Sequence, residues 1–532
     1  MKKTMKQHSF TARLKSLAVV FGIALAFASC ANEDVAQNPT NPNEDNDKNL
    51  TTFVAGDETK TRTSMDYTSG DFYWEAGDYI YVKDDDGVLQ KSTNAPDQKV
   101  ASFKYKVPGK FTASSSYKVY YLGKNSSSNS VSISIYQFQT SPDNTAHLGT
   151  AGDYGTATAQ KVTGKNQFAF ELEHQPAYLV FQPYTSNTIL QNCYLTSIEV
   201  SSNDDIAEEY TVNPTTGALD ASAVTNGKKI ILVTQDPTSG SSYNSGFPLT
   251  NNVASRTTNG AYMVIKPGTH TLRVRYWVKD KATGVRGTIT KILSQKTYAP
   301  NTYYDMTANL NVRDYDGTKY YMWDAQQNYW AGHEWNSASP WQPTLDSQPA
   351  NLNYAQSNSD PRYKNEGGGS GRFDATQSCA GLPNVNEMYW YCEKGDCHWD
   401  ADELWTTMGH LYKGGMWFKK KAYINGYDIN NSPGAWDRRN DNGTPKSTNA
   451  DESLLSPSEA NKYFYLPALG YYYKGQLYNV GKEGYYWSSS SPGARPGGES
   501  AYYLKFSYDF GQYYSYVFYT IREIGARVQA FE

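Results

Sequence analysis

Cysteine is the residue type whose spacing in this sequence most directly suggests chemistry. Cys392 and Cys397 are separated by Glu-Lys-Gly-Asp, a distance at which two thiols can close a tight disulfide loop. Zinc binding is the alternative, but the neighbouring His398 alone leaves a tetrahedral ligand set incomplete. We therefore predict a disulfide between Cys392 and Cys397 and no metal site, and leave open whether Cys193 and Cys379 pair.

The sequence patterns that frame known active sites are missing. No Gly-x-Ser-x-Gly elbow positions a serine nucleophile, and the chain has no phosphate loop, His-x-x-x-His pair or dinucleotide fingerprint. The stretch Asp84-Asp85-Asp86-Gly87 is typical of a solvated hairpin tip, because the remaining oxygen ligands of a calcium loop are absent. We predict no catalytic residue, no cofactor and no enzymatic activity.

The first thirty residues have the organisation of an export signal. Five basic residues precede an apolar run over residues 17–27, and this run is shorter than the roughly 20 residues that a membrane-spanning helix needs. The following Phe27-Ala28-Ser29-Cys30 resembles the lipobox of bacterial lipoproteins. This resemblance implies that residues 1–29 are removed and that Cys30 carries acyl chains such as palmitate, which anchor the chain in outer-membrane lipid. Export also permits disulfides.

Residues 30–50 form an acidic, polar stretch with almost no apolar side chains. Such a segment cannot bury enough surface to fold, so we predict a disordered tether. The acidic residues directly after Cys30 resemble the signal that sends lipoproteins of gut and oral anaerobes to the cell surface. Removing the five basic signal residues changes the charge balance from 49 against 53 to 44 against 53, or about −9. This balance argues against nucleic acid as a partner.

The composition and periodicity favour a mainly β fold. Only 19% of residues are charged and 46 are Tyr, and apolar residues alternate with polar ones at 131–135, 168–172 and 272–278. Pro-Gly and Asn-Gly turn signals separate these runs. We predict two tandem β-sandwich lobes, at residues 51–190 and 191–312.

Several stretches of this region resemble the fimbrillin family, which comprises subunits and accessory proteins of donor-strand pili in Bacteroides-like anaerobes. They are residues 53–56, 60–64, 72–82, 168–179, 195–200 and 298–306. The resemblance implies pairing with pilus subunits by strand donation, and it makes Arg62 a candidate point of proteolytic cleavage. Because a further domain follows where a donor strand would lie, we expect this chain to cap or decorate a fibre.

The C-terminal part, residues 316–532, is loop-rich and aromatic. Asn384 followed by Glu387 predicts a capped helix, and a second short helix is expected over residues 401–408. Residues 381–387, 464–471, 475–477, 480–490, 501–506 and 525–528 resemble a paralogous domain of Bacteroidota and Fibrobacter surface proteins. The resemblance implies an α+β, C-type-lectin-like fold related to sulfatase-modifying factors. Residues 485–532 lack the reactive cysteines that oxidases of that fold use.

Aromatic side chains among Gly, Asn and Asp residues are candidates for ligand contact in this domain, because flat rings bind at a low entropic cost. The candidates are Trp399, Trp436, Tyr472, Tyr485 and Trp487. The leading hypothesis is an accessory or tip-type pilus component or adhesin, with the C-terminal domain binding a glycan or a host or bacterial surface protein. The alternative is a glycan-binding surface lipoprotein of a polysaccharide-uptake system.

Overall fold

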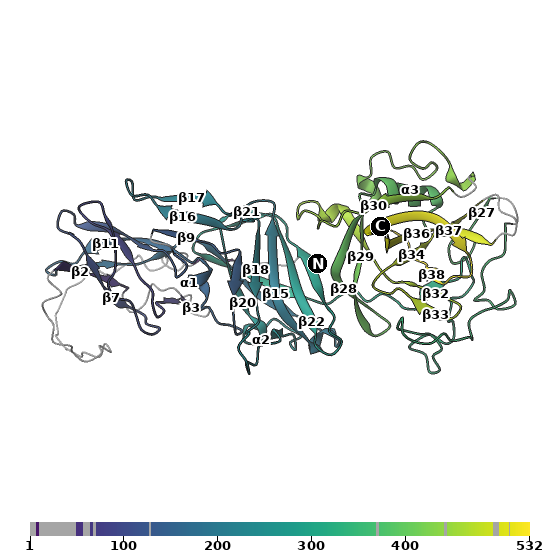
Figure 1. The fold of residues 1–532 in the computed structure, drawn as a ribbon, viewed down its shortest axis with the longest axis horizontal. Coiled ribbons are helices and arrows are strands. Elements are labelled where there is room, and N and C mark those ends of the chain that lie inside the picture. Colours follow the sequence, from purple (N-terminus) through teal and green to yellow (C-terminus); the bar gives the residue numbers. More distant parts are fainter. Residues whose placement is uncertain are drawn as a thin grey trace, which may run out of the picture.

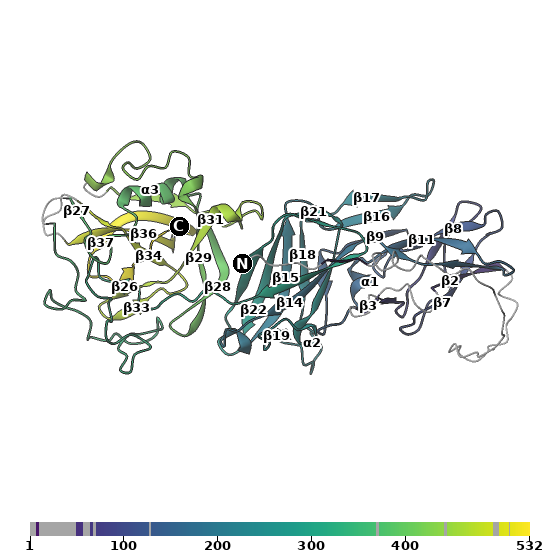
Figure 2. The same cartoon turned by 180° about the vertical axis from the view of Figure 1, so that it is seen from behind.

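The chain forms three bodies in a row, and the same order is seen from the front and from behind (Figures 1 and 2). The computed structural model describes residues 7–9, 49–56, 64–66, 71–126, 129–368, 372–440, 444–492, 499–509 and 511–531. The predicted lipidation at Cys30 and cleavage at Arg62 lie outside these residues. None of the helices in this part of the chain has the length and apolar character of a membrane crossing.

The first lobe is one sheet folded around an aromatic core. Its strands, in spatial order β6-β5-β8-β11-β12-β2-β7 with β13 beside β11, are β2 (Leu50–Ala55), β5 (Tyr81–Lys83), β6 (Leu89–Lys91), β7 (Phe103–Pro108), β8 (Ser116–Tyr121), β11 (Gly155–Lys161), β12 (Gln167–Phe170) and β13 (Glu173–His174). Thr93 N–H donates to Lys106 O at 2.8 Å and so brings the two ends of this order together. Trp74 is fully buried in the core.

The second lobe packs a small sheet on a large one. The small sheet has the order β1-β25-β14-β20, with β1 (Gln7–Ser9), β14 (Ala177–Tyr184), β20 (Ala261–Ile265) and β25 (Thr302–Asn309). The large sheet begins with β10 (Tyr136–Phe138), β18 (Lys229–Val233), β15 (Cys193–Ser202), β22 (Leu272–Asp280) and β23 (Arg286–Ile292), with β19 (Phe247–Pro248) beside β15. Apolar side chains that alternate along these strands meet between the sheets, where Phe181 packs edge-on against Tyr276.

The two lobes share strands. β9 (Ser130–Ser132) leaves the first lobe and pairs with β16 (Glu208–Val212), which pairs in turn with β17 (Leu219–Ala223). The β16–β17 turn reaches back to the first lobe, where Lys83 Nζ donates to Pro214 O at 2.6 Å and Tyr120 Oη donates to Gly217 O. In the described part of the chain, β14 pairs with β20 and β25 of the second lobe. Residues 177–184 therefore belong to the second lobe, although the predicted boundary at residue 190 assigned them to the first.

Short elements complete the second lobe. They are α1 (Leu148–Ala151), η2 (Leu190–Asn192), α2 (Arg256–Asn259), the pair β21 (Gly268–His270) and β24 (Lys296–Tyr298), and, near the first lobe, the pair β3 (Ser64–Asp66) and β4 (Asp71–Tyr73). The overall content is mainly β, as the sequence predicts.

In the described residues, the C-terminal domain combines one α-helix and three short 3-10 helices with several sheets. A six-stranded sheet runs β26 (Tyr320–Tyr321), β38 (Ala526–Arg527), β34 (Gly484–Trp487), β36 (Ser500–Asp509), β37 (Gln512–Ile521) and β30 (Lys446–Asn449). Two further pairs are β27 (Phe373–Asp374) with β35 (Ser490–Ser491), and β32 (Tyr471–Tyr473) with β33 (Gln476–Tyr478). The helices are α3 (Val385–Lys394), η3 (Lys421–Tyr423), η4 (Arg438–Asn440) and η5 (Ala460–Lys462).

A shared sheet joins the second lobe to the C-terminal domain. β28 (His398–Thr407), β29 (His410–Lys419) and β31 (Tyr463–Pro467) extend the large sheet, with Thr288 of β23 opposite Glu403 of β28. The helix expected over residues 401–408 is therefore wrong. Strand pairing with β29 on one side and β23 on the other outweighs the local helix preference of these residues.

Buried charges line this joint. Arg275 donates to Asp400 Oδ1 at 3.2 Å, and both side chains are almost fully buried. The Thr290 hydroxyl donates to Glu403 Oε2 at 2.6 Å. Gly287 lies against the backbone of Asp402, where a Cβ would approach the carbonyl oxygen to 2.4 Å. The joint is thus a close backbone contact with hydrogen-bonded charges.

Candidate recognition sites

Helix α3 begins at the predicted cap. The Asn384 side chain accepts from Glu387 N–H at 3.2 Å, and Glu387 Oε2 accepts from Asn384 N–H at 2.8 Å. This reciprocal capping box satisfies two backbone donors at the start of the helix. The confirmed cap fixes the first turn of α3, from which several polar side chains reach outward.

Those side chains hold the segment that we call the α3 loop, residues 421–440, which arches over α3 in Figure 1. Trp390 Nε1 donates to the carbonyls of Asp428 and Asn431, at 3.0 and 2.7 Å. Asn384 Nδ2 donates to Ile429 O at 3.0 Å. Because backbone carbonyls of the loop are bonded to a helix, the loop has a defined conformation without strand pairing.

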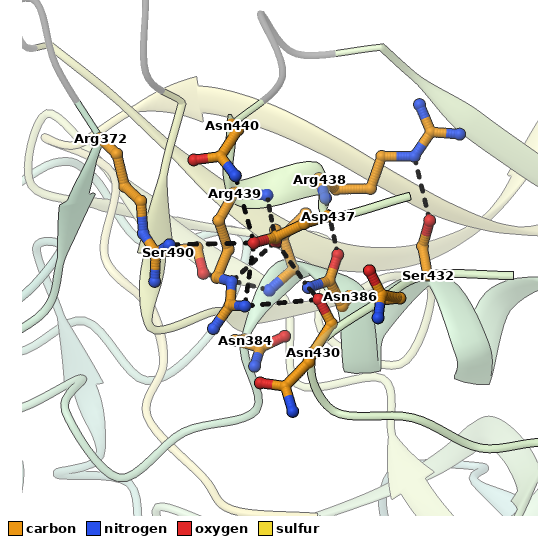
Figure 3. Close-up of polar contacts among 12 residues, drawn as sticks. Arg372, Asn384, Asn386, Asn430, Ser432, Asp437, Arg438, Arg439, Asn440 and Ser490 are labelled. Atoms are coloured by element: carbon orange, nitrogen blue, oxygen red, sulfur yellow. Dashed lines mark hydrogen bonds and ion pairs between the residues drawn. The ribbon is translucent and has the colours of Figure 1, made fainter. Parts of the chain in front are cut away.

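Asn386 is the centre of this arrangement (Figure 3). Its side chain is fully buried, and Nδ2 donates to Asn430 O and to Asp437 Oδ1, both at 2.9 Å. Its Oδ1 accepts from Arg438 N–H at 2.8 Å. One buried amide therefore bonds both ends of the segment 430–438 to the helix.

Asp437 neutralises arginines at the edge of the loop. Arg439 donates to both of its carboxylate oxygens, at 2.7 and 2.9 Å, and Arg372 lies 3.8 Å away. Burial disfavours the charged carboxylate, but the hydrogen bonds from Arg439 and Asn386 outweigh it and lower the pKa of Asp437 from 3.8 to about 2. The carboxylate and its guanidinium partners are a fixed scaffold at neutral pH.

The α3 loop exposes large apolar side chains on this scaffold. Tyr423, Ile429 and Trp436 are 51%, 52% and 57% exposed. The Trp436 carbonyl accepts from the backbone and side chain of Ser432, at 2.8 and 2.9 Å, so the turn that carries the ring is closed. Fixed, solvent-facing rings are suited to binding and have no role in the core.

Of the five predicted ligand-contact aromatics, Trp436 alone is well exposed. Trp399, Tyr472 and Trp487 are buried and belong to the hydrophobic core. Tyr485 is half-buried and stacks between Tyr471 and Tyr503. Sequence composition could not separate these rings, because core and surface aromatics have the same neighbours in the chain.

The predicted disulfide between Cys392 and Cys397 is not formed. Both residues are buried free thiols, and Cys392 Sγ lies 3.2 Å from Ser515 O. Burial raises the pKa of Cys392 to about 11 and that of Cys397 to about 12, so both stay protonated at neutral pH. Cys193 and Cys379 are also buried and free.

A second candidate site is the small sheet of the second lobe, whose two edges differ. At the β20 edge, Gln137 bonds both the N–H and the carbonyl of Val264, at 2.9 and 2.8 Å. Gln139 accepts from Tyr262 N–H at 2.8 Å, and His147 Nε2 lies 2.9 Å from Tyr262 O. Side chains thus occupy the outward backbone groups, and no further strand can add here.

The β25 edge is covered differently. β1 pairs with it in antiparallel register, with His8 opposite Tyr303. β1 has three residues and β25 has eight, so the pairing spans less than half of the strand. Residues 7–9 fall within the segment that the sequence predicts to be removed as a signal peptide.

In the described part of the chain, no group of three or more His, Cys, Asp or Glu residues is placed to hold a metal ion. Sequence reasoning missed Ile429, Gln137 and Gln139. Gln137 and Gln139 alternate with aromatic residues in and next to a short strand, and polar residues at such alternate positions normally face solvent.

No protein-family model and no curated protein matches the chain. A candidate cell adhesion protein from Bacteroides ovatus is 12% identical, with a TM-score of 0.31 over 49% of this chain and 93% of its own. The fimbrial anchor protein Mfa2 from Porphyromonas gingivalis is 14% identical, with a TM-score of 0.22 over 46% and 82%. A fimbrial protein from Bacteroides ovatus is 11% identical, with a TM-score of 0.21 over 90% and 99%. The neighbours are adhesion and fimbrial proteins, but such low scores establish no shared function.

Proposed function

We propose that the chain is a cell-surface lipoprotein that accepts a β-strand from a pilus subunit along β25, as an accessory or tip-type pilus component or adhesin. The observation that carries this proposal is the difference between the two edges of one sheet. The β20 edge is closed by side chains that remain in the mature chain, whereas the β25 edge is paired with a segment of the predicted signal peptide.

Removal of residues 1–29 takes β1 away and leaves outward N–H and C=O groups on β25. Such groups gain free energy when an extended strand from another chain pairs with them, which is β-augmentation. β25 has eight residues and β1 pairs with three of them, so a longer incoming strand would share more of this edge than β1 does. The longer pairing favours the intermolecular partner.

The C-terminal domain explains why the chain would end or decorate a fibre. It follows β25 directly and is held by the β23–β28 contact, so the chain after the second lobe is already folded and does not supply a donor strand. We propose that this domain is the ligand-binding module, presented by the α3 loop, and that the protein has no enzymatic role.

Substitution of Thr307 tests the strand-acceptor role. N–H directions alternate along a strand, and Leu310 N–H donates inward to Tyr184 O, so Thr307 N–H points outward. Thr307→Pro removes this outward donor and keeps the bonds to β14, whereas Thr307→Ala keeps both. Wild type and Thr307→Ala are expected in the sheared pilus fraction, and Thr307→Pro is expected to be depleted from it.

The two variants are compared after their thermal stabilities are shown to match. Loss of strand acceptance is then distinguished from unfolding of the lobe. Equal amounts of Thr307→Pro and Thr307→Ala in the pilus fraction would contradict the proposal. Binding on a glycan array by a protein that never enters the pilus fraction would favour the alternative, a glycan-binding lipoprotein of a polysaccharide-uptake system.

A further inference from the structure

The α3 loop concentrates exposed apolar side chains in a short segment of the C-terminal domain. Tyr423, Ile429 and Trp436 lie within fourteen residues of one another in sequence, and each is more than half exposed. Two of them are aromatic, but Ile429 is a branched aliphatic residue. Exposing three such groups on one loop has a free-energy cost in water unless a partner covers them.

The loop is already held in one conformation before any partner binds. Trp390, Asn384 and the buried Asn386 of α3 bond four of its backbone carbonyls, those of Asp428, Ile429, Asn430 and Asn431. Tyr427 Oη donates to Glu387 Oε1 at 2.7 Å. A pre-organised loop loses little conformational entropy on binding, so its exposed side chains contribute more of their contact energy to affinity.

The segment is basic within an acidic chain. The α3 loop, residues 421–440, contains Lys421, Arg438 and Arg439 against Asp428 and Asp437, a net charge of +1, and Lys419 and Lys420 directly before it raise this balance to +3. The whole chain has a formal charge of −4. Local positive charge on an acidic protein favours encounter with a negatively charged partner surface.

The mixture of side chains distinguishes two kinds of acidic partner. A polysaccharide stacks its sugar rings on Trp436 and bonds its acid groups to Arg and Lys, but it gains little from Ile429. A protein surface can bury Ile429 as well as the aromatic rings, and Trp, Tyr and Arg are the residues that dominate protein interfaces. The aliphatic side chain therefore favours a protein.

We infer that the α3 loop is a docking surface for a partner protein whose own surface is acidic and exposes apolar side chains. The inference rests on the proposed role of the C-terminal domain as a ligand-binding module and names the class of its ligand. The apolar side chains supply most of the affinity, and the basic residues supply the encounter rate and its salt dependence.

The test measures binding of the full mature chain to an immobilised copolymer of glutamate and tyrosine, with hyaluronan as the acidic polysaccharide. Ile429→Ser and Trp436→Ala are each expected to weaken copolymer binding about tenfold or more. Phe138→Ala is the matched control, because Phe138 is 60% exposed on the second lobe, and it is expected to bind as wild type does.

Thermal unfolding of each variant confirms that the loop is folded. Copolymer binding that weakens with added salt and with both loop substitutions supports the inference. The inference is overturned if wild type does not bind the copolymer, or if hyaluronan binds and only Trp436→Ala weakens it. Neither result affects entry of the chain into the pilus fraction through β25, so failure of this inference is distinct from failure of the strand-acceptor role.

Discussion

The β20 and β25 edges belong to the same small sheet but are closed in different ways. At β20, Gln137, Gln139 and His147 bond the outward backbone groups of Tyr262 and Val264. At β25, the partner is the backbone of β1. A side-chain seal is part of the folded lobe, whereas a backbone partner can be exchanged for another strand without changing the fold.

A third edge, that of β23, has a permanent strand partner. β23 carries β28 of the C-terminal domain, and the contact is strengthened by Arg275 with Asp400 and by Thr290 with Glu403. The β20 edge is closed by side chains, the β23 edge has a permanent strand partner, and the β25 edge has a partner that we propose is exchanged for a strand of another chain. Each prediction below removes one of these features.

The largest effect is expected from breaking the β20 seal. Replacing Gln137 and Gln139 by Leu leaves the N–H and carbonyl of Val264 and the N–H of Tyr262 buried without these partners. Each such group costs roughly 1–3 kcal/mol, so the double substitution is expected to lower the free energy of unfolding by about 4 kcal/mol. Urea denaturation followed by tryptophan fluorescence measures this loss.

Gln356→Leu is the control, because Gln356 is exposed and its amide bonds only a nearby loop carbonyl. Its effect is expected to stay within about 0.5 kcal/mol. A double variant as stable as this control would show that the amides at β20 are incidental, and the contrast between the two edges would disappear.

The contrast also shows what a single sequence can reveal. Alternation predicts β22, because a period of two is a local signal that packing between sheets then reinforces. The Asn384–Glu387 cap is equally local. The seal at β20 is not predictable in this way, because Gln137 and Val264 are brought together only by the fold.

The structure of the C-terminal domain is harder to predict from sequence for the same reason. Residues 401–407 belong to β28, which pairs with β29 directly after it and with β23, which lies far earlier in the chain, and the local pattern that favours a helix contains no sign of β23. Trp399 and Trp436 have similar sequence surroundings, yet one is buried against Phe506 and the other faces water. Exposure depends on which residues the loop passes over, and this is non-local information.

A smaller effect is expected from crowding the β23–β28 contact. The Cβ of Gly287→Ala would lie 2.4 Å from Asp402 O and 2.8 Å from a Leu404 methyl, so the strands must move apart. Such overpacking costs about 1–3 kcal/mol. Limited proteolysis is expected to separate the second lobe from the C-terminal domain faster than in wild type.

Gly381→Ala is the matched substitution, because no atom lies within 4 Å of its added Cβ. It is expected to be cleaved at the wild-type rate. Equal cleavage of the Gly287→Ala chain would mean that the shared sheet does not hold the two bodies together.

The smallest effect is expected on the pH dependence of stability, through a carboxyl group at the same β23–β28 contact. Glu403 is half-buried as a residue, but burial of its carboxyl and the nearby Asp400 raise its pKa from 4.5 to about 7. The folded chain therefore keeps a proton on Glu403 that the unfolded chain releases at lower pH. Stability from this group is present below about pH 4.5 and is lost as pH rises to 7.

Glu403→Gln removes this titration and keeps a polar side chain beside Thr290. The Tm difference between pH 5 and pH 8 is expected to be smaller in Glu403→Gln than in wild type, with Glu171→Gln, on an exposed side chain, behaving as wild type. If the Tm difference between pH 5 and pH 8 is unchanged in Glu403→Gln, a residue other than Glu403 is responsible for it.

The central claim is that β25 receives a strand from another chain once residues 1–29 are gone. A photoreactive amino acid at Thr307, in β25, is compared in living cells with one at Thr257, in α2 directly before β20 in the sequence; both threonines are exposed. We predict a covalent adduct between position 307 and a terminal strand of a pilus subunit, identified by mass spectrometry, and none at position 257. Adducts at 257 alone, or adducts at 307 only within the same chain, would contradict the account.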